Sequence, residues 1–178
     1  SIHDSDIQYA REKGVKIKLV AQVVKLDDAH FTLFVMPEFV SPARYIYSVD
    51  DEYNGVVIRG ECYDRQFMFG KGAGSLPTAS SVLSDIMARS HDYRYEYKKQ
   101  NYLSLPAYTT DVVLRVYVRY SSTNVPHVLN LEKVYEQYIS EESNYVIADV
   151  RLSELIAKRE ALRAPDIFLC NIPNFFDD

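Results

Sequence analysis

A glycine-rich segment in the middle of the chain, GKGAGSLPTASSV at residues 70–82, carries the clearest potential for ligand chemistry. Gly70, Gly72 and Gly74 permit backbone conformations closed to other residues and let a ligand approach the main chain. A predicted helix follows directly, and the N–H groups and positive dipole end of a helix N-terminus attract anions. The segment therefore predicts either a ligand-contacting loop or a tight turn without a ligand.

The glycine segment does not match the conventional nucleotide-binding motifs. It follows two strands that look antiparallel, no βαβ unit surrounds it, and it departs from the pattern G-x-x-x-x-G-K-S/T. If a dinucleotide binds to this protein, we expect the segment to be a second contact, because the main phosphate cradle is missing.

Other reactive side chains give no recognisable site. The four histidines are scattered, Cys62 and Cys170 lie far apart without a C-x-x-C, and no G-x-S-x-G hydrolase turn occurs. Lys16 and Lys18 lie on one face of a predicted strand, where we expect them to be solvated rather than to donate protons. The sequence therefore predicts no catalytic residue and no metal site.

The composition argues against some classes of binding partner. The chain has 178 residues and a formal net charge of −5, which disfavours nucleic acid and anionic membranes. No apolar run approaches the roughly 20 residues that cross a bilayer, and the polar opening is unlike a signal peptide. We expect a cytoplasmic protein, and because Ser1 already leads into a predicted helix, we expect a longer parent chain.

Periodicity predicts the elements of the first half. We expect Pro37 on a strand edge or at a strand end, a strand junction at Asp64-Arg65, and Ser75 as the N-cap of the last helix. In the first strand, Val15, Ile17, Leu19 and Ala21 alternate with more polar neighbours, which indicates one more buried face. The expected elements are a helix ending near Gly14, a hairpin of 15–26 and 31–40, a connection or short helix at 41–54, strands at 55–64 and 65–72, and a helix at 76–91.

The second half predicts a smaller region. Tyr93, Tyr95 and Tyr97 alternate with charged residues and indicate an exposed strand or a linker, and Leu105-Pro106 marks the expected boundary. Beyond this boundary we expect strands at 110–120, 144–150 and 166–172 with helices at 128–139 and 151–162 between them.

Together these elements predict an α+β fold, in which a mixed or antiparallel sheet with helices packed on one face precedes a small α+β module. We place the two domains at residues 1–100 and 107–178. Fifteen tyrosines and no tryptophan favour extensive interface area, and we expect a homodimer through the sheet of the first region.

Three segments, in order along the chain, resemble one enzyme family. The pattern GxGAGxxPTAxxVxxD, from Gly70 to Asp85, resembles the C-terminal segment of the homoserine dehydrogenase catalytic domain. Upstream, DIQYAREKGVKIKLVAQV is similar to that family's DIxYAxxxGxxIKL segment, and VDDEYNGVVIRG resembles the strand before its glycine loop. The resemblance covers about residues 4–90.

The resemblance implies an oxidoreductase that moves a hydride between NAD(P) and the aspartate-semialdehyde/homoserine pair, on the pathway to threonine and methionine. It implies that the cofactor binds mainly to an N-terminal Rossmann domain, with a further contact from Gly72, Ala73 and Gly74. The family's Rossmann glycines, catalytic Asp/Lys segment and substrate-binding Glu lie before the region matched by Asp4. We therefore expect this chain alone to be inactive and to bind no NAD(P) tightly.

The C-terminal segment NVPHVLNLEKVYEQY resembles a regulatory ACT domain, which follows the catalytic domain in many homoserine dehydrogenases. Pro126, Val128 and Leu129 keep the ACT pattern, whereas His127 replaces the glycine that admits an amino-acid effector. The predicted order is also one strand short. We expect a degenerate packing or oligomerisation module, and the alternative for the whole chain is a non-catalytic amino-acid-sensing or assembly domain.

Overall fold

The computed structural model describes residues 1–60, 62–93, 105–121, 129–141 and 143–173. The chain divides into two units, one formed by Ser1–Ser41 together with Pro106–Asp178 and the other by Pro42–Leu105. This division differs from the expected domains 1–100 and 107–178, because the first two long strands join the same sheet as the C-terminal strands.

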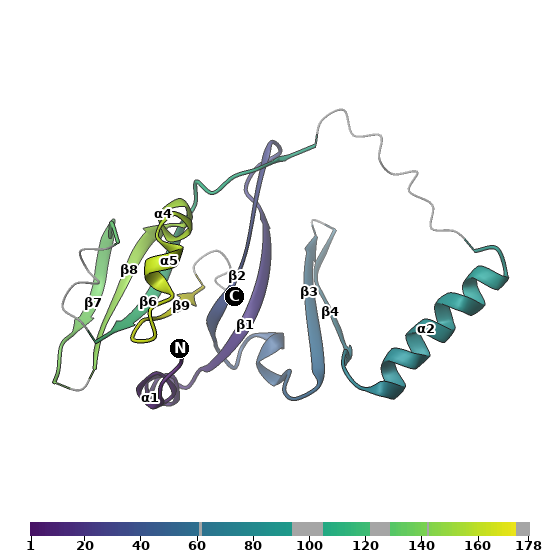
Figure 1. Cartoon of the computed structure of the whole chain (residues 1–178). Helices are drawn as coiled ribbons and strands as arrows, with labels where there is room; N and C mark the ends of the chain where they lie inside the picture. The colour runs from purple at the N-terminus through teal and green to yellow at the C-terminus, as the bar shows by residue number, and fades with distance from the viewer. Residues whose placement is uncertain (61, 94–104, 122–128, 142, 174–178) are drawn as a thin grey trace. The chain divides into compact units, whose positions relative to one another are not determined.

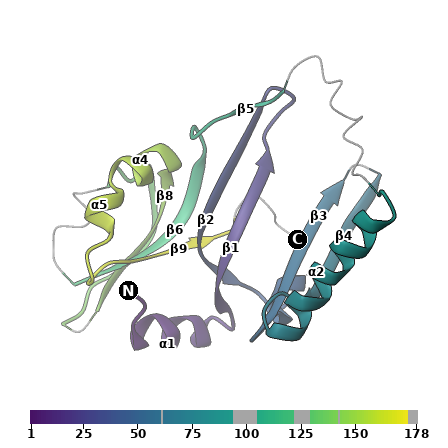
Figure 2. The ribbon, with the colours of Figure 1, turned by 45° about the vertical axis from the view of Figure 1, so that its right-hand side comes forward.

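Unit 1 is built on a mixed sheet of seven strands in the order β1-β2-β9-β6-β8-β7, with β5 also paired to β2 (Figure 1). β2 runs parallel to β9 and β5, and the other pairs are antiparallel. The strands are β1 (Lys16–Lys25), β2 (His30–Val40), β5 (Ala107–Tyr108), β6 (Val113–Tyr120), β7 (Lys133–Tyr138), β8 (Asn144–Arg151) and β9 (Phe168–Ile172). Figure 2 shows the long β1–β2 hairpin that brings residues 16–40 into this sheet.

Helices cover both faces of this sheet, in contrast to the predicted single face. Successive residues of a strand point to opposite faces, so Val116 and Val118 of β6 enter one core and Tyr117 enters the other. The helices are α1 (Asp4–Glu12), α4 (Leu152–Ala157) and α5 (Arg159–Leu162). Leu152 of α4 packs in the first core and Ala10 of α1 in the second. The predicted α+β class with a mixed sheet is confirmed.

Unit 2 consists of a short 3-10 helix, a two-stranded antiparallel hairpin and one long helix. The elements are η1 (Tyr45–Ser48), β3 (Tyr53–Gly60), β4 (Tyr63–Lys71) and α2 (Ser75–Ser90). Stacked rings cover one part of the hairpin, with centroid distances of 5.6 Å for Tyr45 and Phe67 and 4.7 Å for Tyr53 and Phe69. None of the residues in these four elements is buried.

The structure corrects details of the first half. β2 continues through Pro37, whose register partner is Leu19 on β1. On the other side of β2, the described register pairs involve only His30, Phe31 and Glu38, so Pro37 interrupts no described pair there. Strand β3 ends at Gly60 and β4 begins at Tyr63, and these two residues form the last register pair of the hairpin, so the strands do not meet at Asp64-Arg65.

The face that the alternation indicated is buried only at the start of β1, where the partly buried Val15 and Ile17 pack against the second core. Leu19 and Val23 are 74% and 73% exposed, whereas Gln22 and Val24 are buried. Farther along β1 the side that carries Gln22 and Val24 is therefore the more buried one, opposite to the indicated face.

The predicted helix at 128–139 is wrong, since residues 133–138 form strand β7 against β8. The register shifts at Tyr135, between Val134 and Glu136, so one extra residue enters the strand. Such a bulge breaks the strict alternation of a strand and lets apolar residues recur at helix-like spacing. Of the predicted tyrosine segment only Tyr93 is described, directly after the turn that follows α2, and residues 94–104 lie outside the described residues.

Candidate functional site

The predicted ligand-contacting residues form the short connection between β4 and α2. Gly72, Ala73 and Gly74 are exposed, and the Gly72 N–H donates to the Glu52 carbonyl oxygen at 3.2 Å. This hydrogen bond fixes where the chain leaves the hairpin, while the backbone of the following residues stays accessible to solvent. The connection therefore has the openness that a ligand contact requires.

Gly74 is the residue at which the chain turns into α2. Its φ of 112° and ψ of 152° lie in a region that only glycine adopts without strain. Its carbonyl oxygen accepts hydrogen bonds from the N–H of Thr78 at 3.2 Å and from the Thr78 Oγ1 at 2.8 Å. Gly74 is thus the N-cap, and the prediction that Ser75 would fill this position is wrong because Ser75 already lies within the helix.

Gly70 and Gly72 meet different surroundings. A Cβ added at Gly72 would lie 1.4 Å from Nδ2 of Asn54, whereas a Cβ at Gly70 would have nothing within 4 Å. Asn54 is exposed, so its side chain has room to rotate away. Neither glycine has a positive φ, and among the three predicted glycines only Gly74 uses that freedom.

The positively charged residue next to the loop, Lys71, already forms an ion pair. The Lys71 ammonium lies 2.7 Å from the Glu52 carboxylate and 5.3 Å from the centre of the Tyr53 ring. The hydrogen bond from Lys71 holds the pKa of Glu52 below its usual value. Attraction of an anion therefore rests on the first-turn N–H groups of α2, such as those of Ser75 and Leu76, which a helix leaves without an intrahelical partner.

Sequence reasoning missed Glu52 and Asn54, the two residues of the neighbouring strand region that shape this loop. The hairpin register pairs Asn54 with Gly70. A correct prediction of the turn between β3 and β4 would have given this pairing, and with it the position of Glu52 and Asn54 beside the loop. In the described part of the chain, no three metal-ligating side chains come together.

None of the described helices combines the length and apolar character needed to span a bilayer. Both cysteines are free, Cys62 exposed and Cys170 buried. Burial, and then the nearby charges of Glu38 and Asp6, raise the pKa of the Cys170 thiol.

Residues 1–87, which end inside α2, match the family model of homoserine dehydrogenase. Over this segment, nearly half of its length, the chain is similar to the homoserine dehydrogenase family. It is 33% identical over 87 residues to the Bacillus subtilis homoserine dehydrogenase, covering 49% of this chain and 20% of that protein. A longer match, 30% identical over 143 residues, joins 72% of this chain to 33% of the Synechocystis homoserine dehydrogenase. The chain thus spans a third or less of these two curated relatives.

Solved homoserine dehydrogenases share this chain's fold beyond the matched segment. A structure from Thiobacillus denitrificans superimposes with a TM-score of 0.66 at 23% identity, covering 97% of this chain and 46% of that one. A Staphylococcus aureus homoserine dehydrogenase gives a TM-score of 0.54 at 20% identity, over 96% of this chain and 44% of that one. These likenesses concern the fold alone, and they extend over both units of the chain.

Proposed function

We propose that this chain is the C-terminal part of an NAD(P)-dependent homoserine dehydrogenase, which transfers a hydride between the cofactor and the aspartate-semialdehyde/homoserine pair for threonine and methionine synthesis. The observation that carries the proposal is the family-matched segment 1–87, whose glycine loop lies open at the start of α2. An exposed main chain at a helix N-terminus suits a phosphate-bearing cofactor.

In this proposal Gly72, Ala73 and Gly74 contact the cofactor, and an N-terminal Rossmann domain of the same parent chain provides the main cradle. The missing side chain at Gly74 leaves room for the ligand, and the α2 dipole favours its negative charge. In this proposal the reacting groups come from the parent's other domain.

Exposed apolar surface supports partners for both units. In unit 2 it includes Val56, Met68, Leu83 and Ile86, and in unit 1 the outer face of the β1–β2 hairpin carries Leu19, Val23, Leu33 and Val35. Exposed apolar side chains in such numbers favour an interaction surface. We propose that the Rossmann domain and a second subunit of a homodimer cover them, and the two free thiols fit a reducing cytoplasm.

Kinetics of the full-length parent enzyme test the loop. Gly72→Val, made together with Asn54→Ala to free the space that the Asn54 amide fills, adds a branched side chain where the cofactor would approach, at a position without a positive φ, and Asn54→Ala alone controls for the loss of the amide. We expect a cofactor KM raised at least about tenfold, which is about 1.4 kcal/mol of lost binding. Gly70→Val, two residues earlier in open space, is the matched control and should change KM much less. Equal KM values for both variants and the parent would remove the cofactor role of the loop.

Binding to the isolated chain provides the complementary test. Because most phosphate contacts are expected from another domain, titration of NADPH or NADH into this chain should give no saturable signal in the micromolar range. A micromolar dissociation constant, or about −8 kcal/mol, would mean that the chain holds the main cofactor site and that our placement is wrong.

A second function is favoured by one observation. Unit 1 contains two cores, one on each face of its sheet, and it includes the described C-terminal region. A binding or assembly domain that folds by itself would have such cores. In this alternative the chain senses an amino acid or assembles subunits without catalysis. A panel of the twenty amino acids in a thermal shift assay discriminates, since the dehydrogenase proposal with a degenerate ACT-like module expects no stabilising ligand.

A further inference from the structure

The two cores of unit 1 are both shared between the start and the end of the chain. Phe34 and Met36 enter a core whose other members come from residues 112–167. On the opposite face, Ala10 and Phe39 pack with residues 117–170. The apolar side chains that residues 1–41 contribute to these cores therefore pack against C-terminal residues.

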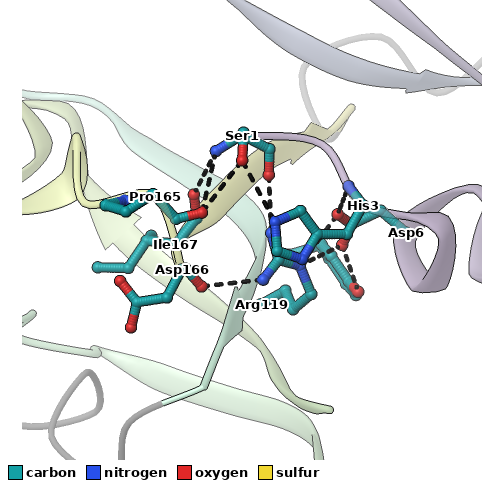
Figure 3. A network of polar contacts seen from close by, with 8 residues as sticks. Ser1, His3, Asp6, Arg119, Pro165, Asp166 and Ile167 are labelled. Carbon is teal, nitrogen blue, oxygen red and sulfur yellow. Dashed lines mark hydrogen bonds and ion pairs between the residues drawn. The ribbon is translucent and has the colours of Figure 1, made fainter. Parts of the chain in front are cut away.

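A buried ion pair joins the same two regions at α1. The Arg119 Nε of β6 lies 3.0 Å from Oδ2 of Asp6, and the two side chains are only 2% and 0% exposed (Figure 3). The Asp6 carboxylate also accepts hydrogen bonds from the Tyr117 hydroxyl at 3.1 Å and from the His3 N–H at 2.8 Å. The carboxylate is thus held by groups from both ends of the chain.

The rest of the Arg119 guanidinium binds backbone. Its Nη1 donates to the Asp166 carbonyl at 2.9 Å, and its Nη2 donates to the Ser1 carbonyl at 2.7 Å. Ser1 in turn donates from Oγ to the Pro165 carbonyl at 3.1 Å (Figure 3). One side chain therefore ties together the residues before α1, α1 itself and the loop before β9.

A second polar link lies on β2 and repeats this arrangement. The buried Glu38 carboxylate accepts a hydrogen bond from Nδ2 of Asn171 on β9 at 3.0 Å and another from Nε2 of Gln22. Glu38 and Asn171 are also the register pair that connects β2 to β9 in parallel. The hairpin is therefore fastened to the C-terminal strands independently of α1.

We propose that residues 1–41 and 106–173 form one cooperative folding unit locked by Arg119 and Asp6, so that the C-terminal region is a structural half of this domain rather than a hinged regulatory module. Arg119 is the positioning residue for α1 and for the chain that leads into it. This inference goes beyond the proposed function, and it needs neither the cofactor nor the reaction. A ligand on the C-terminal region would act on residues 1–41 through the shared sheet.

Hydrogen exchange of the whole chain tests the lock. Arg119→Met leaves Asp6 as a buried charge without its main partner, a change that is strongly destabilising. We expect amides of α1 and β1 to exchange about 100-fold faster than in the unmodified chain. The control is Arg163→Met, which removes an exposed pair with Glu160 and should change these rates less than threefold.

Different exchange results would support or overturn the proposed lock. An acceleration below tenfold in Arg119→Met, or the same acceleration in Arg163→Met, would overturn the lock. If Arg119→Met does not fold, native-state exchange of the unmodified chain decides. Amides of α1, β2, β6 and β9 should then open together within about tenfold of one another. A helix α1 that opens more than tenfold more readily than β6 would show separate units, whatever the fate of the dehydrogenase proposal.

Discussion

Unit 1 and unit 2 contain similar apolar residues but differ in how far these residues are buried. Strands β6, β8 and β9 of unit 1 bury most of their side chains in two cores, whereas no residue of η1, β3, β4 or α2 in unit 2 is buried. Yet unit 2 carries the glycine loop, the segment most specific to the family. The comparison teaches that the segment proposed to serve the reaction lies in the unit whose elements bury no residue, while unit 1 packs around two cores of its own.

Truncating one leucine in each unit should give the largest contrast. Leu114 of β6 is fully buried and Leu83 of α2 is 59% exposed. Leu114→Ala is expected to lower the free energy of unfolding by about 2–5 kcal/mol because it leaves a cavity. Leu83→Ala should change it by about 0.5 kcal/mol or less, since an exposed site leaves no cavity. Urea unfolding followed by circular dichroism measures both, and similar losses would reveal a hidden core in unit 2.

The two thiols report the same contrast without mutation. Cys62, in unit 2, is exposed, whereas Cys170, in unit 1, is buried with a raised pKa. A thiol reagent at pH 8 should modify Cys62 at once and Cys170 only through opening of the sheet, which makes its rate at least about 100-fold slower. Two thiols reacting at one rate in the folded chain would contradict the cores of unit 1.

Glycine substitutions refine the comparison within unit 2. Gly74→Ala forces a side chain into a glycine-only backbone region and should cost about 1–3 kcal/mol at the start of α2. Gly70→Ala should cost much less, because its Cβ meets open space and its φ is not positive. Hydrogen exchange of the first turns of α2 measures both effects. Equal exchange in the two variants would mean that Gly74 is not needed for the turn.

Alkaline pH should weaken unit 1 by a smaller amount. Burial raises the pKa of Tyr9 from 10.0 to about 12, and burial with the nearby Asp6 carboxylate raises that of Tyr117. A raised pKa means that the folded state favours the neutral phenol, so this stabilisation is complete below pH 10 and is lost as pH rises through about 12. The melting temperature should fall over that range, less so in Tyr9→Phe. An identical fall in Tyr9→Phe would assign the effect elsewhere.

The sequence predicted the local elements correctly where the hydrophobic periodicity agreed with the turn-forming and capping residues. The first helix, the β1–β2 hairpin, the long helix α2, the strands β6, β8 and β9, and the helical segment after β8 are confirmed. Strand β7 was missed because its bulge at Tyr135 gives apolar residues a helical spacing, and only pairing with β8 selects the extended form. The predicted N-cap was one residue too late. Ser75 has a side chain suited to capping, but the backbone turns into the helix at Gly74, whose positive φ favours glycine.

The sequence by itself determined the likeness to one enzyme family, the mixed α+β class and the position of the glycine loop, because motifs and periodicity are local properties of neighbouring residues. Only the tertiary structure decided which face of β1 is buried, that helices cover both faces of the sheet, and that Asp6 meets Arg119 across 113 positions of the chain. Those outcomes depend on which distant segments meet, and the free energy of burying a side chain is fixed by its neighbours in space rather than in sequence.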